Sequence, residues 1–94
     1  MEITGIIWLE DIVEKLAWKH HVMESEVLEV LKNKPKFRFV EKGHIPDENL
    51  YAALGQTYAG RYLIVFFVYK KTREALIVSA RNMTDPERNR YEHK

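Results

Sequence analysis

Arg81 stands where an arginine could act on a phosphate group. It ends a predicted strand and precedes a predicted helix that carries Arg88 and Arg90. The planar guanidinium fork matches two phosphate oxygens, so one interpretation of Arg81 is a phosphate-binding residue. The alternative is an arginine at a strand end that pairs with Glu87 or another carboxylate of the helix. The spacing alone leaves both interpretations open.

His20 is the second residue with a suitable type and position. It lies at the C-terminal end of the first predicted helix, beside Lys19. An imidazole exchanges protons near neutral pH, and a helix C-terminus favours its cationic form. His20 could therefore act as a general acid or base, or its ring could only cap the last carbonyl groups of the helix.

Other common catalytic patterns do not occur in this sequence. His21 and His44 have no spacing that suggests a site, and there is no HxH, HExxH or acidic cluster. We therefore expect no metal site. The sequence also lacks a glycine-rich phosphate loop and a nucleophile elbow, so we expect no bound cofactor.

Tyr91 is the aromatic residue best suited to contact a nucleobase. It lies among Arg88, Arg90 and His93 on the last predicted helix, and a base can stack on an exposed ring between cations. Most of the other tyrosines are expected to pack in the core or on a sheet face. An enzyme acting on a small molecule is the least favoured function, because no pocket motif is present.

The charges are unevenly distributed although the net charge is only +1. Residues 8–31 carry six acidic residues against two lysines, whereas residues 32–44 are mainly basic and residues 59–73 contain no acid. A domain with one basic side can attract a polyanion to that side. The alternative is that these lysines and arginines are simply solvated residues of strands and turns.

These side chains must be positioned by helices and strands that the sequence pattern predicts. Apolar residues recur at helical spacing in residues 8–20 and 24–33, and Pro35 follows the second helix. Extended segments are predicted at residues 37–40, 50–58, 62–69 and 74–81, and the run at 62–69 is apolar enough for a central strand. Thr84-x-x-Glu87 is a capping box, which predicts a last helix beginning at Thr84 or Asp85.

The predicted order is α-α-β-β-β-β-α. Short connections between the strands favour an antiparallel meander, so we expect an α+β fold with an antiparallel sheet of about four strands. Two N-terminal helices and one C-terminal helix pack on this sheet. Alternation along the last strand places Ile77, Ser79 and Arg81 on one face. Residues 1–94 show no linker or repeat and are expected to form a single domain.

The composition limits the class of protein. Hydrophobic residues make up 46% and charged residues 31%, which is typical of a folded globular domain, and cysteine is absent. Residues 1–8 lack the basic leader of a signal peptide, and the apolar run at 62–69 is too short to cross a bilayer. We therefore expect a cytoplasmic protein with no membrane partner.

Several segments, in order along most of the chain, resemble the BrnT family of type II toxins. The most specific is Val78-Ser79-Ala80-Arg81, followed by Thr84-x-x-Glu87-Arg88 and Arg90-Tyr91-Glu92. Ala53-Leu54-Gly55, and Gly60-Arg61 before an apolar strand, are similar to the middle part of the family's sequence pattern. Trp8 and Lys19-His20-x-Val22 are similar to the N-terminal part of that pattern.

The resemblance implies a RelE-like fold and a ribonuclease of a bacterial toxin-antitoxin system. Such an enzyme cleaves RNA without a metal, by attack of the 2′-hydroxyl on the adjacent phosphate. The implied partner is a BrnA-like ribbon-helix-helix antitoxin that neutralises the toxin, and operator DNA is bound only through that antitoxin.

The family pattern also implies roles for individual residues of this chain. His20 is the implied general base or acid, Arg61 and Arg81 stabilise the phosphate, and Glu87 supports the catalytic site. The implied RNA-binding residues are Lys19, Arg88 and Tyr91.

The chain departs from the family pattern at three places. His21 replaces a glycine that usually follows Lys-His, so a residue with a Cβ must close that turn, and we expect a positive φ. Leu50 replaces an arginine, and residues 9–12 lack a lysine that is common there. These losses support an alternative function: a non-catalytic RNA-binding or protein-binding module that retains the toxin fold.

Overall fold

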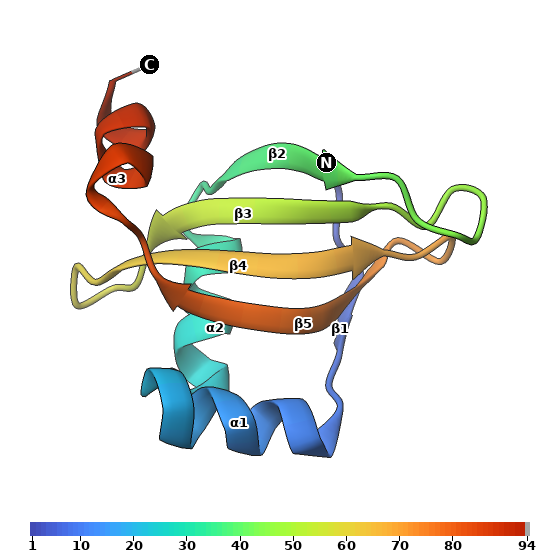
Figure 1. Cartoon of the computed structure of the whole chain (residues 1–94), viewed down its shortest axis with the longest axis horizontal. Coiled ribbons are helices and arrows are strands. Elements are labelled where there is room, and N and C mark those ends of the chain that lie inside the picture. The colour runs from blue at the N-terminus through green and yellow to red at the C-terminus, as the bar shows by residue number, and fades with distance from the viewer. Residues whose placement is uncertain (94) are drawn as a thin grey trace.

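The computed structural model describes residues 1–93, which form a mixed five-stranded sheet with three helices (Figure 1). The strands are β1 (Gly5–Ile7), β2 (Lys36–Glu41), β3 (Leu50–Gln56), β4 (Tyr62–Tyr69) and β5 (Glu74–Asn82). The helices are α1 (Glu10–His20), α2 (Glu24–Lys32) and α3 (Asp85–Glu92). The predicted α+β class is confirmed, and each predicted helix and strand is present with ends within two residues of the prediction.

β4 lies at the centre of the sheet, whose strand order is β1-β5-β4-β3-β2. Its apolar sequence predicted this central position. It pairs antiparallel with β3 and with β5, as the short connections between these strands predicted. The prediction of about four antiparallel strands was wrong because β1 adds a fifth strand, which runs parallel to β5 and pairs Gly5 with Glu74. β1 was not predicted because a strand of three residues is too short to show an alternation of apolar and polar residues, and because its partner β5 lies far along the chain.

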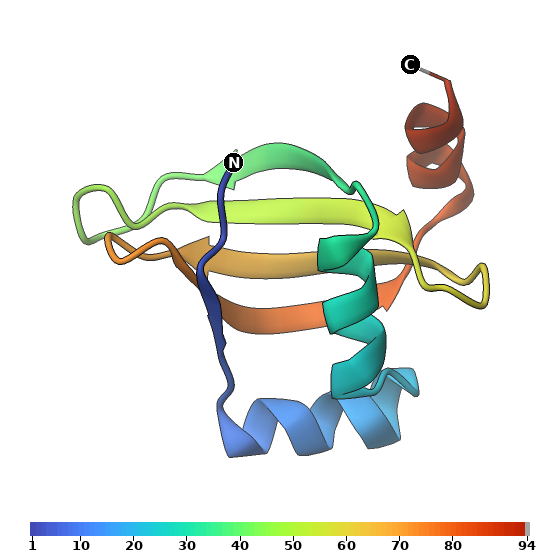
Figure 2. The same ribbon diagram turned by 180° about the vertical axis from the view of Figure 1, so that it is seen from behind.

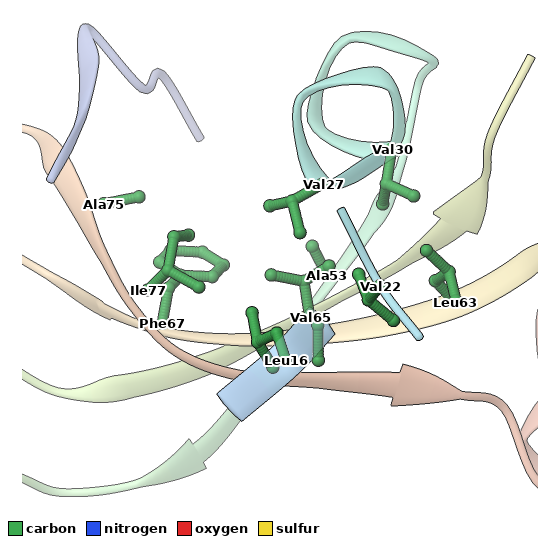
Figure 3. Packing of buried hydrophobic residues seen from close by; sticks show 11 residues of the cluster. Leu16, Val22, Val27, Val30, Ala53, Leu63, Val65, Phe67, Ala75 and Ile77 are labelled. Carbon is green, nitrogen blue, oxygen red and sulfur yellow. The ribbon is translucent and has the colours of Figure 1, made fainter. Parts of the chain in front are cut away.

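Figure 2 shows α2 lying across one face of the sheet, with α1 alongside the β5 edge. α1 packs against β5, and α2 packs against β3 and β4. Burying one large apolar side chain stabilises the fold by about 1.5–3 kcal/mol, so the buried cluster on this face fixes the helices on the sheet. Figure 3 shows this cluster, whose members are Leu16, Val22, Val27, Val30, Ala53, Leu63, Val65, Phe67, Ala75, Ile77 and Ala80.

The opposite face, called the open face below, carries a smaller apolar cluster. Ala52, Leu54 and Ile64 are buried there, against the partly buried Phe66, Met83 and Tyr91. Directly opposed residues of neighbouring strands share a face. The strand register therefore assigns to the open face Lys36, Arg38, Ala52, Leu54, Ile64, Phe66, Ser79 and Arg81.

A β-bulge in β5 decides which face Arg81 occupies. Phe66 pairs with Ser79 and Phe67 pairs with Ile77, so Val78 is an extra residue between the two pairs. The extra residue reverses the alternation of side chains along the strand. The prediction that Ile77 shares a face with Arg81 was therefore wrong: Ile77 is buried beneath the helices, and Arg81 lies on the open face.

The turn between α1 and α2 is closed by His21, which has φ 54° and ψ 40°. The expected positive φ is confirmed. The amide of Val22 donates to the carbonyl oxygen of Leu16 at 3.0 Å, which ends α1 in the manner usual for a left-handed C-terminal residue. This turn buries Val22 completely and starts α2 across the sheet.

α3 begins after the capping box that the sequence predicted. The Glu87 amide donates to Oγ1 of Thr84 at 3.3 Å, and the Thr84 amide donates to Oε1 of Glu87 at 2.8 Å. α3 stands at the end of the sheet where β5 ends (Figure 1). In the part of the chain that the structure describes, no helix has the length and apolar character needed to cross a membrane.

Candidate functional site

Arg81 extends from the end of β5 over the open face and is held there by Glu87. Its Nη1 and Nη2 atoms donate to the two carboxylate oxygens at 2.7 and 3.0 Å, and Nη1 also donates to the carbonyl oxygen of Asn82 at 3.1 Å. The predicted pairing with Glu87 is therefore present. A guanidinium has five N–H donors, so Nε–H and one Nη2–H have no partner among residues 1–93. The Arg81 side chain is 35% exposed, which leaves it accessible to an anion.

The Glu87 carboxyl is strongly stabilised as an anion. The hydrogen bonds from Arg81 lower the pKa of Glu87 from 4.5 to about 2, against the opposing effect of partial burial, and the Thr84 amide adds to the lowering. The same pair raises the pKa of Arg81. At neutral pH Glu87 therefore accepts hydrogen bonds and is a very weak base, which suits it to hold Arg81 in place.

Arg88 and two tyrosines lie beside this ion pair. The Arg88 guanidinium carbon is 3.9 Å from the centre of the Tyr62 ring, and Nε of Arg88 is 3.4 Å from Oε1 of Glu92. The Tyr62 hydroxyl donates to the other oxygen of Glu92 at 3.1 Å. The rings of Tyr62 and Tyr91 meet edge to face, with centroids 6.0 Å apart. Arg81, Glu87, Arg88 and Tyr91, which the sequence singled out, are therefore brought together at one end of the open face.

Two rows of side chains cross the open face from β5 to β2. One row is Arg81, Ile64, Leu54 and Lys36, and the other is Ser79, Phe66, Ala52 and Arg38. Each row ends in a cation of β2, and the buried Ile64, Leu54 and Ala52 between the ends have Phe66, Met83 and Tyr91 packed against them. With strands about 4.8 Å apart, three steps separate the backbones of Arg81 and Lys36 by about 14 Å. This arrangement could bind an extended polyanion across the strands.

Arg61 has a different environment from Arg81. Its Nη1 donates to the His21 carbonyl oxygen at 2.6 Å and to Glu26 at 3.1 and 3.2 Å, while Nη2 donates to the His20 carbonyl oxygen at 3.1 Å. Its Nε donates to Oδ1 of Asn82 at 2.9 Å. Arg61 therefore joins the end of α1, the first turn of α2 and the end of β5, and the structure gives it a clear structural role.

His20 and Lys19 lie at the end of α1, in the layer of helices. His20 is half-buried and Lys19 is exposed. Within residues 1–93 no hydrogen bond or ion pair joins either side chain to Arg81. The only link to Arg81 is indirect: Arg61 binds the His20 carbonyl oxygen and the Asn82 side chain, and Asn82 accepts a bond from Arg81. The structure thus places His20 at the same end of the sheet as Arg81 but on the opposite face.

The acid-free run at residues 59–73 does not form one basic surface. Arg61 precedes β4, whereas the other three cations follow it. Lys70 pairs with Glu48 at 2.8 Å and Arg73 pairs with Glu2 at 2.7 Å. Three of the four cations of this run, Arg61 included, are therefore neutralised by acids from other parts of the chain.

Lys36 and Arg38 belong to the site, although the sequence suggested no individual role for them. They alternate with Phe37 and Phe39 in β2, which places both cations on one face of the strand. That alternation was a usable signal. The sequence did not show that β2 is the edge strand next to β3. It therefore did not show that Lys36 and Arg38 share a face of the sheet with Arg81.

Comparison of the chain with models of known protein families and with curated protein sequences found no match.

Proposed function

We propose that this chain is a metal-independent ribonuclease, a toxin of a bacterial type II toxin-antitoxin system similar to the BrnT family. The observation that supports the proposal most is Arg81 itself. Its guanidinium is oriented by Glu87 on an exposed face, keeps two N–H donors without partners among residues 1–93, and lies on an apolar floor. A preorganised donor of this kind can bind a phosphate whose charge grows during the reaction.

In the proposed reaction a 2′-hydroxyl of RNA gives up its proton and attacks the adjacent phosphorus atom, and the 5′-oxygen takes up a proton as it leaves, so that the products are a 2′,3′-cyclic phosphate and a 5′-hydroxyl. Arg81 stabilises the charge on the non-bridging phosphate oxygens, and Glu87 acts as a positioning residue for Arg81. His20 is proposed to transfer a proton to or from an RNA strand that passes around the sheet edge near Asn82. Arg61 acts in this scheme by fixing the backbone of His20.

The remaining partners follow from the same family resemblance and are part of the proposal. A BrnA-like ribbon-helix-helix antitoxin would neutralise the toxin, and operator DNA would be bound only by that antitoxin. The proposed location is the cytoplasm, where both RNA and the antitoxin are made.

The second candidate is a non-catalytic binding module that retains the toxin fold. Two observations favour it. Arg61 and Arg81 are both held by intramolecular ion pairs, and His20 lies on the opposite face from Arg81. In this case the open face would bind RNA or protein without turnover.

An RNA cleavage assay separates the two candidates. We expect the purified chain to cleave total bacterial RNA in the presence of EDTA and to arrest growth when it is induced in cells. Replacement His20→Ala should slow cleavage about 100- to 10,000-fold if the imidazole transfers a proton. His44→Ala, which changes an exposed histidine of the loop before β3, is the matched control and should cleave like the wild type.

Three results would count against the ribonuclease. Cleavage that EDTA abolishes would contradict the metal-independent reaction. A folded His20→Ala variant with full activity would remove His20 from the mechanism. A wild-type chain that binds RNA or an antitoxin but neither cleaves RNA nor arrests growth would favour the binding module.

A further inference from the structure

A small pocket opens between β2 and α3, at the edge of the open face. Its volume is about 250 Å³, and it is lined by Lys36, Phe37, Arg38, Leu54, Arg90 and Tyr91. Three of these six residues are cations and none is acidic. Pockets for drug-sized ligands usually hold about 300–1,000 Å³, so this one has room for a single small group such as a nucleobase.

The cations of the pocket differ in what they already bind. Lys36 Nζ donates to the Tyr91 carbonyl oxygen and lies 5.0 Å from the centre of the Tyr91 ring. Arg38 and Arg90 are exposed, and neither side chain forms a hydrogen bond or ion pair with another of residues 1–93. Their guanidinium groups therefore remain available for an anion, and phosphate matches their planar fork.

The Tyr91 ring gives the pocket an aromatic wall. It is partly buried against the cluster of Ala52, Leu54 and Ile64, and its edge-to-face contact with Tyr62 restricts its orientation. A nucleobase gains stacking energy on such a ring without requiring a particular sequence. Cations beside an ordered ring, over an apolar floor, are the features that recognise a nucleotide of a single strand.

We propose that this pocket binds one nucleotide of a single-stranded RNA, with its phosphate on Arg38 and Arg90 and its base against Tyr91. The inference rests on the proposed ribonuclease function and adds to it a binding subsite away from the cleavage site. The backbones of Lys36 and Arg81 lie about 14 Å apart along one row of the sheet, so an extended RNA strand held in the pocket can reach Arg81 over Phe66 and Tyr91, which pack against the buried Leu54 and Ile64. The pocket would thus hold the substrate while Arg81 acts on a different phosphate.

Binding can be measured apart from cleavage with a fluorescein-labelled 2′-O-methyl RNA octamer of random sequence, which lacks the attacking hydroxyl. We expect the wild type to bind this probe in a fluorescence anisotropy titration. Tyr91→Leu should weaken binding about 5- to 100-fold, the range for loss of one stacked base, whereas Tyr91→Phe should retain it. The double replacement R38Q/R90Q should lower the slope of log affinity against log salt by about 0.7, the value for one phosphate contact of a single strand.

The matched control is Lys71→Gln, which removes an exposed charge from the turn between β4 and β5. It should leave the binding constant within a factor of about two, because it lies outside the pocket. R38Q/R90Q alters only exposed side chains, so it tests the pocket even where Tyr91→Leu impairs folding. Wild-type affinity and salt slope in folded R38Q/R90Q, or a wild type that does not bind the probe, would overturn the proposal.

The two proposals can fail separately. If the wild type cleaves RNA and the pocket variants bind and cleave equally well, the subsite is wrong and the ribonuclease stands. If the wild type binds through the pocket but does not cleave unmodified RNA, the subsite stands and the ribonuclease is wrong.

Discussion

Arg81 and Glu87 face each other across the junction of β5 and α3, with Nη1 and Nη2 of the guanidinium 2.7 and 3.0 Å from the two carboxylate oxygens. Glu87 also closes the capping box with Thr84, so one carboxylate both starts α3 and orients Arg81. The position of the arginine thus depends on the first turn of the helix that follows it.

Protonation of Glu87 should weaken this junction at low pH. The pKa of Glu87 is about 2 in the folded chain and 4.5 in its ordinary state. Because the folded pKa is the lower one, the contribution to stability is fully present above pH 4.5 and is lost as the pH falls toward 2. Glu87→Gln should unfold in less urea than the wild type at pH 7, by about 1 kcal/mol in the free energy of unfolding. The difference should shrink between pH 4.5 and 2, and a difference that stays constant over this range would contradict the assignment.

Arg61 should contribute more to stability than Arg73, although both are ion-paired arginines of the same basic run. Arg61→Ala removes charged hydrogen bonds to two carbonyl groups, Glu26 and Asn82, and should lower the free energy of unfolding by about 2–3 kcal/mol. Arg73→Ala breaks a pair in which both side chains are more than 60% exposed, and should cost about 0–1 kcal/mol. Urea denaturation of the two variants is the measurement. Equal losses of stability would show that Arg61 does not hold the ends of α1 and β5 and the start of α2 together.

His21→Gly should stabilise the chain. The left-handed conformation costs a residue with a Cβ about 1–2 kcal/mol, and glycine loses about 0.5–1 kcal/mol in chain entropy. The expected net gain is therefore roughly 0.5–1 kcal/mol, visible as a higher Tm. His21→Ala keeps the Cβ and should show no such gain, which makes it the control. A Tm for His21→Gly at or below that of His21→Ala would contradict a left-handed His21.

The elements with strong local signals were predictable. The eight apolar and aromatic residues of β4 have the predicted bounds, because a continuous run of this length between two turns is typical of a strand buried on both faces. The capping box at Thr84 and Glu87 gave the start of α3 for a similar reason, since both partners lie within one helical turn. The left-handed turn at His21 was predicted from the resemblance to the BrnT family, in which a glycine usually stands at that position.

Features that depend on distant partners were not predictable. β1 forms by pairing with the edge of β5, which lies far along the chain. The bulge at Val78 puts Arg81 on the open face, and no residue type near Val78 marks the bulge in the sequence. The candidate site shows the same limit. The pairing of Arg81 with Glu87 was among the interpretations of the sequence, but the binding of Arg61 to the α1–α2 turn requires contacts across the whole domain.

Single-turnover cleavage of a labelled RNA in EDTA measures whether Arg81 stabilises a phosphate during RNA cleavage. Arg81→Gln should cleave about 100- to 1000-fold more slowly than the wild type, as expected for loss of a donor to a developing charge. The double variant R81Q/E87Q re-forms an uncharged pair that can keep α3 in place, and it should be folded and equally slow. Arg73→Gln, a change of charge at the other end of the sheet, should cleave at the wild-type rate. Folded R81Q/E87Q that cleaves as fast as the wild type would contradict the role of Arg81.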